Sequence, residues 1–284
     1  MLPEIPPDNF PVEEEEESDI GFIPSAMAYV AMPHSEQKGV AVFKRTNGRS
    51  TFSILNDPDI GLPFGKIPRL MVAFICSRAK KTGERVIDIG SNQSQFMRML
   101  GMGNSGGSNG AIHRVRDQAH RLFMSNITIT SNFTDESGDA EGFSWNKLSI
   151  TDEGMSLWNP HAPQREKWVG QITLTEKFFK ECIEHAIPVS MQTLHDLRSP
   201  LAMDVYVWMT YRYNTLERLT NISWRQMQMQ IGSGYPQTTR GSLDFKQNFK
   251  KQIAAVSELY PSAKFKINDN GILLIPSPTH IAML

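Results

Sequence analysis

Cysteine is scarce in this sequence, and long hydrophobic runs are missing. The two cysteines, Cys76 and Cys182, lie far apart without metal-ligand spacing, so we expect neither a disulfide framework nor a zinc site. We interpret them as small core residues of a reduced, cytosolic protein. The apolar runs, such as residues 70–76, are too short to cross a membrane. The first residues, 1–4, do not start the basic region and apolar run of a secretory signal, so we expect that the protein is not secreted.

Motifs of catalysis and nucleotide binding are missing as well. The seven histidines lie singly, and the sequence has no Cys-x-x-Cys, His-Glu-x-x-His or Gly-x-Ser-x-Gly motif. Residues 101–106 match the letters of the dinucleotide-binding fingerprint but follow a predicted helix instead of a strand. Residues 61–67 are one residue short of a phosphate-binding loop and carry Ile67 where Ser or Thr would bind magnesium. We therefore expect no enzyme, no metal and no cofactor.

Charge is divided unevenly along the chain, although the formal net charge is only −1. Residues 1–65 hold 4 basic and 11 acidic side chains, including five consecutive Glu at 13–17, whereas residues 66–284 hold 25 basic and 19 acidic side chains. An acidic leader joined to a basic body is typical of a nucleic-acid-binding protein with a separate tail. Ordinary scatter of charge is the alternative, and it does not explain the run of Glu.

The clearest structural pattern lies near the C-terminus. We expect, in order, a short strand (222–223), a helix (224–231), a turn rich in Gly and Pro (232–236), a long helix (242 to about 260) and a hairpin (264–275). Ser242 is expected to cap the long helix, and Asn270-Gly271 is a strong hairpin signal. Two helices and a closing hairpin are the parts of a winged helix.

The long helix is amphipathic. Phe245, Phe249 and Val256 recur on one face at helical spacing, whereas Lys246 and Lys250 point the other way. A basic outer face suits DNA binding. A lysine face that is merely solvated is the alternative interpretation.

A similar order of elements is expected in the first half of the chain. Helices are predicted over residues 68–81, from Ser91, and over 111–124, followed by a hairpin within 127–150. A strongly apolar helix over 201–213, with Ser199-Pro200 at its start, opens the second unit. The sequence thus predicts an α+β protein with two tandem winged-helix (helix-turn-helix variant) domains.

We place the domain boundaries where composition and pattern change. The expected parts are an acidic leader, flexible and partly disordered (1–58), an N-terminal winged-helix domain (59–155), a connecting segment (156–189) and a C-terminal winged-helix DNA-binding domain (190–284). Within the leader, residues 1–20 are expected to be disordered, and residues 21–55 to add one or two strands. The connecting segment is expected to hold a strand at 171–174 and a helix at 175–185, and Pro188 is expected to separate this helix from a short one at 190–197.

Several stretches resemble the RepA and TrfA type of plasmid replication initiator. They are residues 61–70, 96–101, 199–212 and 273–278, within a resemblance that covers roughly residues 60–279. The most specific is 199–212, in which Ser-Pro-Leu-Ala precedes an aromatic-rich helix that ends in Tyr-Arg. The resemblance implies two winged-helix domains that bind repeated double-stranded origin sequences (iterons). It also implies origin melting without nucleotide hydrolysis and recruitment of the host initiator and replicative helicase.

The same resemblance implies an assembly and a location. Related initiators are often homodimers in solution and monomers on DNA, with the N-terminal winged helix supplying the dimer surface. The protein would act in the bacterial cytoplasm, bound to its plasmid and not to a membrane.

The expected DNA contacts follow from how a recognition helix enters the major groove. In the second unit, Arg240, Lys246 and Gln247 are suited to base edges. The residues suited to phosphates or to the ends of the helix are Thr238, Thr239, Ser242, Lys250, Lys251 and, in the hairpin, Lys264 and Lys266. The counterparts in the first unit are His113, Arg114, Gln118 and Arg121, with Ser108 and Asn109 in the preceding loop.

Three other functions are consistent with parts of the pattern. A winged-helix transcriptional repressor would bind DNA without opening an origin. A nuclease or relaxase would need a metal-ligand cluster, which the sequence lacks. An adaptor would use the same helices to bind a partner protein instead of DNA.

Overall fold

The computed structural model is an α+β protein and describes residues 19–28, 31–47, 50–89, 96–98, 100–103, 110–134, 141–158, 168–232 and 234–282. Its helices are η1 (Ser25–Ala28, a 3₁₀ turn), α1 (Lys66–Thr82), α3 (Ala111–Phe123), α4 (Glu176–Glu184), α5 (Met191–Asp196), α6 (Pro200–Thr215), α7 (Trp224–Ile231) and α8 (Thr239–Leu259). Its strands are β1 (Ile20–Pro24), β2 (Val42–Asn47), β3 (Ser50–Leu55), β4 (Val86–Asp88), β5 (Asn126–Thr134), β6 (Glu141–Lys147), β7 (Thr151–Trp158), β8 (Trp168–Leu174), β9 (Ala186–Ser190), β10 (Thr220–Ser223), β11 (Lys264–Ile267) and β12 (Gly271–Ile275).

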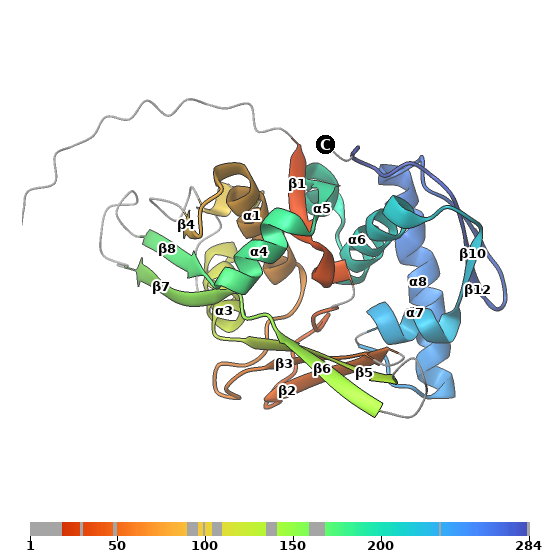
Figure 1. Cartoon of the computed structure of the whole chain (residues 1–284), viewed down its shortest axis with the longest axis horizontal. Helices are drawn as coiled ribbons and strands as arrows, with labels where there is room; N and C mark the ends of the chain where they lie inside the picture. Colours follow the sequence, from red (N-terminus) through yellow and green to blue (C-terminus); the bar gives the residue numbers. More distant parts are fainter. Residues whose placement is uncertain are drawn as a thin grey trace, which may run out of the picture.

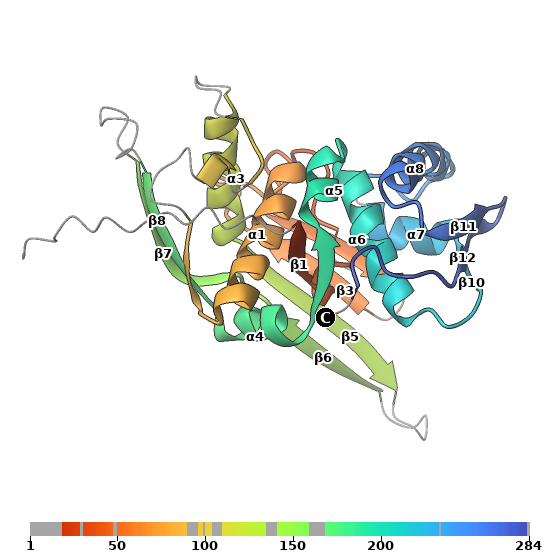
Figure 2. The same ribbon diagram turned by 90° about the horizontal axis from the view of Figure 1, so that it is seen from above.

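The described strands form four antiparallel sheets around two central helices. Their orders are β2-β3-β5-β6, β4-β8-β7, β1-β9 and β10-β12-β11. The four-stranded sheet lies below α1, α3 and α4 in Figure 1, and α6, α7, α8 and the β10-β12-β11 sheet lie to the right. Figure 2 shows the helices grouped above that sheet.

Helices α1 and α6 occupy the interior because they are apolar nearly all round. Almost every residue of α1 from Pro68 to Ala79 is buried, and α6 buries Trp208 and Tyr206 completely or nearly so. Glycines bound α1: Gly65 precedes it with a φ of 77°, and Gly83 ends it in the left-handed conformation, as the sequence predicts. The buried side chains of both halves of the chain belong to one continuous apolar cluster.

Several local predictions are confirmed. Helix α7 spans the expected residues, α6 begins with Pro200 at its first position after Ser199, and Thr175 caps α4 by accepting a hydrogen bond from Phe178 N. The β11–β12 and β5–β6 hairpins pair as expected. The expected helix from Ser91 falls largely on residues outside those described.

The predicted start of α8 is wrong. Helix α8 begins at Thr239, capped by the Thr238 hydroxyl, so Ser242 lies inside its first turn. The final hairpin forms at the predicted place, and its turn is stabilised by Asn268, whose Oδ1 accepts from the backbone N of Asn270 and of Gly271 at 2.9 Å each. Gly271 is needed there, since a Cβ would lie 2.0 Å from the carbonyl oxygen of Ile222.

Segments expected at the margins are part of the fold. Strands β2 and β3 lie within the expected leader and pair with each other, and β3 pairs with β5 residue by residue from Ser50–Ser131 to Leu55–Asn126. Strand β8, within the expected connecting segment, is the middle strand between β4 and β7. Pro188 separates α4 from α5 as expected, and it lies in β9 opposite Phe22, in a two-stranded sheet whose edges tolerate proline. Of residues 1–20, expected to be disordered, 1–18 lie outside those described, whereas Ile20 begins β1.

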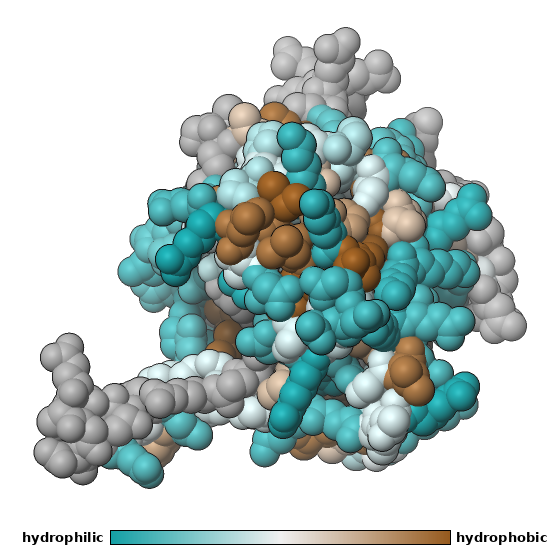
Figure 3. Space-filling view, turned by 90° about the vertical axis from the view of Figure 1, so that its right-hand side faces the viewer, coloured by the Kyte–Doolittle hydropathy of each residue, from teal (hydrophilic) through white to brown (hydrophobic). Residues whose placement is uncertain are grey.

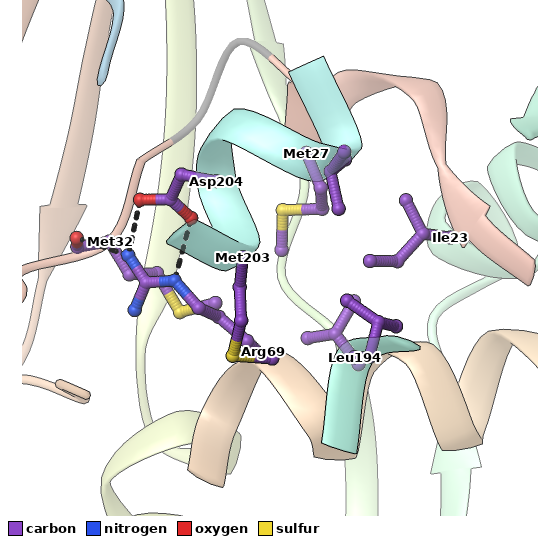
Figure 4. A pocket seen from close by; sticks show the side chains of 9 residues that line it. Ile23, Met27, Met32, Arg69, Leu194, Met203 and Asp204 are labelled. Carbon is purple, nitrogen blue, oxygen red and sulfur yellow. Dashed lines mark hydrogen bonds and ion pairs between the residues drawn. The ribbon is translucent and has the colours of Figure 1, made fainter. Parts of the chain in front are cut away.

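A buried ion pair joins the two central helices. The guanidinium of Arg69 on α1 donates from Nε to Asp204 Oδ1 at 2.6 Å and from Nη2 to Asp204 Oδ2 at 2.7 Å, and Asp204 lies on α6. Figure 4 shows the two groups facing each other beside the apolar side chains of Ile23, Met27 and Leu194. Arg69 also donates to the carbonyls of Met32 and Gly65. One guanidinium thus connects α1, α6 and two loops.

His34 completes this cluster, with Nε2 2.8 Å from Asp204 Oδ2. Burial lowers the pKa of His34 below its ordinary 6.5, although Asp204 opposes the shift. Burial alone would raise the pKa of Asp204, but the charge of Arg69 and hydrogen bonds from Arg69 and His34 lower it below its ordinary 3.8. The structure therefore favours a neutral His34 that donates to an ionised Asp204.

This cluster predicts a loss of stability on acidification. Between the lowered pKa of His34 and 6.5 the unfolded chain binds a proton that the folded chain does not, so stability falls as the pH drops below 6.5. Asp204 adds a loss in the same direction below pH 3.8. We expect His34→Gln to flatten the decrease of Tm between about pH 7 and pH 5. Thermal unfolding at several pH values measures it, and an unchanged pH dependence in the variant would contradict the assignment. His280, whose pKa burial also lowers, accounts for a residual slope.

Candidate nucleic-acid interface

Helices α7 and α8 are joined by a compact, internally bonded turn. Ser223 and Gln226 form a capping box at the start of α7. At its end, buried Gln228 donates to the carbonyl of Pro236 at 3.1 Å and accepts from the Ser242 hydroxyl at 2.8 Å. Gly241 permits this close packing, because a Cβ there would lie 2.1 Å from the Pro236 carbonyl oxygen. The hydroxyl of Ser242 therefore contributes to the turn between the two helices.

The inner face of α8 is apolar as predicted. Phe245, Phe249, Ile253 and Val256 are buried. The rings of Phe249 and Trp224 of α7 meet edge to face with centroids 5.6 Å apart. This packing fixes how α8 projects its opposite face.

The outward face of α8 carries most of the expected DNA contacts. Thr238, Thr239, Gln247, Lys250 and Lys251 are exposed, and so is the side chain of Arg240, at 84 %. Arg240 pairs with Asp244 one turn along the helix at 3.1 Å, an exposed contact of little energy. The sequence interpretation missed Leu243, which is 58 % exposed on this face. A single apolar side chain among polar ones left no signal in the helical periodicity.

Lys246 lies closer to the protein than the other lysines of α8. It is half-buried, its Nζ donates to the carbonyl of Asp269 in the hairpin turn at 3.2 Å, and it lies 5.2 Å from the centre of the Trp224 ring. Lys246 therefore connects α8 to the hairpin, and its ammonium is partly engaged within the protein.

The hairpin extends the basic surface beside α8. Lys264 and Lys266 are exposed on β11, opposite Ile275 and Leu273 of β12. Figure 3 views the molecule from this side and shows teal side chains around small brown patches. A helix face and a neighbouring hairpin, both bearing lysines, form one surface that can contact phosphates and base edges.

The expected contacts on α3 are only partly present. His113 and Arg114 are exposed, whereas Ser108 and Asn109 lie outside the described residues. Gln118 is buried at 4 % exposure, and its Oε1 accepts from the backbone N of Phe64 at 2.8 Å, so its assignment to DNA is wrong. The loop after β3 packs across this side of α3, which the helical periodicity could not reveal.

Arg121 is also engaged within the protein. It forms ion pairs with Asp117 at 2.9 Å and Glu36 at 3.2 Å, and its guanidinium lies 5.3 Å from the centre of the Phe64 ring. Only 15 % of its side chain is exposed. The assignment of Arg121 to DNA is therefore wrong, because its charge and its planar face already have partners.

A hollow of about 540 Å³ lies between α3 and the β4-β8-β7 sheet. Its lining includes His113, Arg116 and His120, but also the carboxylates of Asp117, Asp152 and Glu153. Negative charges beside the helix oppose phosphate binding. The α8 face is therefore the stronger candidate for contact with DNA.

Arg45 was not identified from the sequence, and it holds the end of α7. It lies on β2 and donates from Nη1 to the carbonyl of Gly232 at 2.8 Å and from Nη2 to those of Gln228 and Met229. A cation at a helix C-terminus is favourable, and the three carbonyls gain a donor. Burial lowers the pKa of Arg45 to about 10, so the group stays charged at neutral pH. The four-stranded sheet thereby positions the turn before α8.

Two negative findings apply to the described residues. No group of three or more His, Cys, Asp or Glu there could hold a metal ion. No helix of that part of the chain is long and apolar enough to span a membrane.

Comparisons with known proteins define the class and then the family. The fold is similar to the crystal structure of a selenomethionine derivative of domains 2 and 3 of RctB, with a TM-score of 0.58 and 10 % identity, covering 89 % of this chain and 98 % of that one. A second structure of RctB domains 2–3 gives a TM-score of 0.53 and 9 % identity, covering 87 % and 93 %. At such identities the likeness shows a shared fold.

The family assignment comes from the sequence. A family model described as "plasmid encoded RepA protein" matches residues 62–226, which is more than half of the chain. The chain belongs to this family of plasmid replication initiators. A search of curated proteins gave no match. The matched region ends within α7, so α8 and the final hairpin lie outside it.

The position of Arg45 leads to a testable prediction. Arg45→Ala should weaken binding to a cognate DNA site, because the carbonyls at the end of α7 lose their donor and the α7–α8 turn loosens, at a stability cost of roughly 1–3 kcal/mol. The slope of log affinity against log salt should not change, since Arg45 contacts no phosphate. DNA-binding titrations and thermal unfolding measure both effects.

Neighbouring Lys44 supplies the matched control, because it is exposed on the opposite face of β2. Lys44→Ala should leave stability and binding to the cognate duplex unchanged. Equal effects of the two substitutions on duplex binding would contradict the role of Arg45.

The packing of α8 predicts a purely structural effect of one further substitution. Phe249 is fully buried, so Phe249→Ala should destabilise the fold by roughly 3–5 kcal/mol through the cavity it leaves. Chemical denaturation measures this loss. A change below about 1 kcal/mol would mean that α8 does not pack as described.

Proposed function

We propose that the protein initiates plasmid replication by binding repeated double-stranded sites (iterons) at the origin through a C-terminal winged helix. The observation that carries the proposal is the outward face of α8, on which Arg240, Gln247 and Lys250 are exposed beside the lysines of the hairpin. In this arrangement α8 is the recognition helix, α7 precedes it, and the β11–β12 hairpin is the wing.

The chemistry of the individual groups supports separate roles. Arg240 and Gln247 lie in the N-terminal half of α8, from which a recognition helix contacts base edges. Lys250, Lys251, Lys264 and Lys266 are suited to phosphates. In the first unit, α3 occupies the equivalent place in the order of elements, and His113 and Arg114 are its exposed candidates.

The remaining steps of the proposal rest on family membership. Binding would melt the origin without nucleotide hydrolysis and recruit the host initiator and replicative helicase. The protein would be a homodimer in solution and a monomer on DNA, in the bacterial cytoplasm, and it would not act as an enzyme. A transcriptional repressor is the second candidate, because the same α8 surface would serve it equally well.

Two kinds of substitution on α8 should have different signatures. Lys250→Ala should weaken binding to every sequence alike and lower the slope of log affinity against log salt by about one unit, as for a lost phosphate contact. Gln247→Ala or Arg240→Ala should cost on the order of 1–3 kcal/mol on the cognate repeat and much less on random DNA. Salt titrations of binding, beside thermal unfolding, measure both.

If the Lys250→Ala and Gln247→Ala variants bind the cognate repeat and random DNA as tightly as the unmodified protein does, α8 is not the recognition helix. Permanganate footprinting on a supercoiled origin separates the two candidate functions, because an initiator opens the duplex and a repressor does not.

A further inference from the structure

One face of the β2-β3-β5-β6 sheet is not packed against the described part of the chain. Side chains alternate across a sheet, so Phe43, Phe52, Ile54 and Ile127 share the buried face. The opposite face forms the underside of the molecule in Figure 1. On this face lie Lys44, Thr51, Thr130, Phe143, Trp145 and Lys147, which we call the aromatic sheet face.

The strand register brings these residues into two rows. One row runs from Thr51 through Thr130 to Trp145, and the next from Lys44 through Ser53 and Thr128 to Lys147. Phe143, Trp145 and Lys147 lie in a line along β6, about 6.8 Å apart. Hydroxyl and ammonium groups thus surround the two rings in these rows, and the row beyond Lys44 carries the exposed aliphatic side chains of Val42 and Leu55.

The two aromatic side chains are unusual for their exposure. Phe143 is 66 % exposed and Trp145 62 %, with ring centroids 5.6 Å apart and ring planes tilted by 34°. Burying such rings is strongly favourable, so two adjacent exposed rings mark an interaction site. They contact each other and leave wide faces open to solvent.

We propose that the aromatic sheet face binds single-stranded DNA, with bases stacked on Phe143 and Trp145 and phosphates near Lys44 and Lys147. Base–aromatic stacking beside basic side chains is the usual chemistry of single-strand binding, and hydroxyls add hydrogen bonds to the backbone. The proposal rests on the proposed function, because an opened origin provides the single strand.

The composition of the face disfavours two other occupants. A duplex keeps its base faces stacked inside, so it offers the two rings nothing to stack on. Stable protein interfaces contain few Lys and Ser residues around their aromatic side chains. Both residue types surround these two rings. The charge of the face also suits a polyanion: Lys44 and Lys147 lie in its central row, and Glu141 at the end of β6 is the acidic residue on this side of that strand.

The test compares single-stranded and duplex binding by the full-length protein. Fluorescence anisotropy would follow a labelled oligothymidylate of about 16 nucleotides, and in parallel the origin duplex. The double substitution Phe143→Ala and Trp145→Ala should weaken binding to the oligonucleotide by about 10-fold or more, because each lost stack reduces affinity by a factor of about 5 to 150. Binding to the origin duplex should stay within about 2-fold.

Three further variants control the result. Phe143→Tyr with Trp145→Phe keeps both aromatic faces and should retain single-strand binding. Val86→Ala removes apolar surface that is 42 % exposed on another sheet and should change nothing. Should the double variant unfold, Trp145→Leu keeps apolar bulk without a flat ring and should still lose affinity for the oligonucleotide.

Several outcomes would overturn the proposal. One is a protein that binds the origin duplex but not the oligonucleotide, and another is a folded double variant that binds the oligonucleotide as before. If the double variant no longer self-associates or no longer binds a partner protein, while its affinity for single-stranded DNA is unchanged, the face binds that protein instead. If the unmodified protein does not bind the origin duplex, the proposed function fails as well.

Discussion

The buried pair of Arg69 and Asp204 is the constraint on which the arrangement of the molecule depends. A buried charge without a partner costs several kcal/mol, so each of these two residues requires the other in place. Arg69 also satisfies carbonyls before α1 and in the loop after η1, and His34 donates to the same carboxylate. The pair adds less net stability than its short distances suggest, because desolvation offsets the attraction. The pair contributes instead to the specificity of the fold, because α1 and α6 must pack in the one arrangement that brings Arg69 and Asp204 together.

Arg45 constrains the turn between α7 and α8 in a similar way. The four-stranded sheet ends at β2, and the guanidinium on that strand is bonded to the last carbonyls of α7. Any movement of the sheet relative to α7 would break these bonds. Residues far apart in the sequence therefore determine the position of α8, although α8 itself was predicted from local periodicity. The N-terminal strands thus support the surface that we propose binds DNA.

The sequence predicts the elements of this protein better than their pairing. The helices at 224–231 and 111–123 and the final hairpin follow from periodicity and capping, which are local properties. The antiparallel match of β1 with β9 joins residues about 170 positions apart, and no local pattern encodes it. The same limit explains the error at Gln118 and Arg121, since a helical wheel shows which side is polar but not whether a loop covers it. On α8 most of the predicted side chains are exposed, although Leu243 was missed and Lys246 is half-buried. The stretches 61–70 and 199–212, which carry the family resemblance, meet in the structure through Arg69 and Asp204.

The two halves of the chain do not offer equal surfaces. The outer side of α8 carries lysines beside Asp244, which pairs with Arg240. The outer side of α3 borders a hollow with Asp117, Asp152 and Glu153. Buried residues under α3 and under α8 belong to one continuous apolar cluster. If a DNA site contacts both helices, we expect this shared core, and not the flexibility of a linker, to constrain the spacing of the contacts along the duplex.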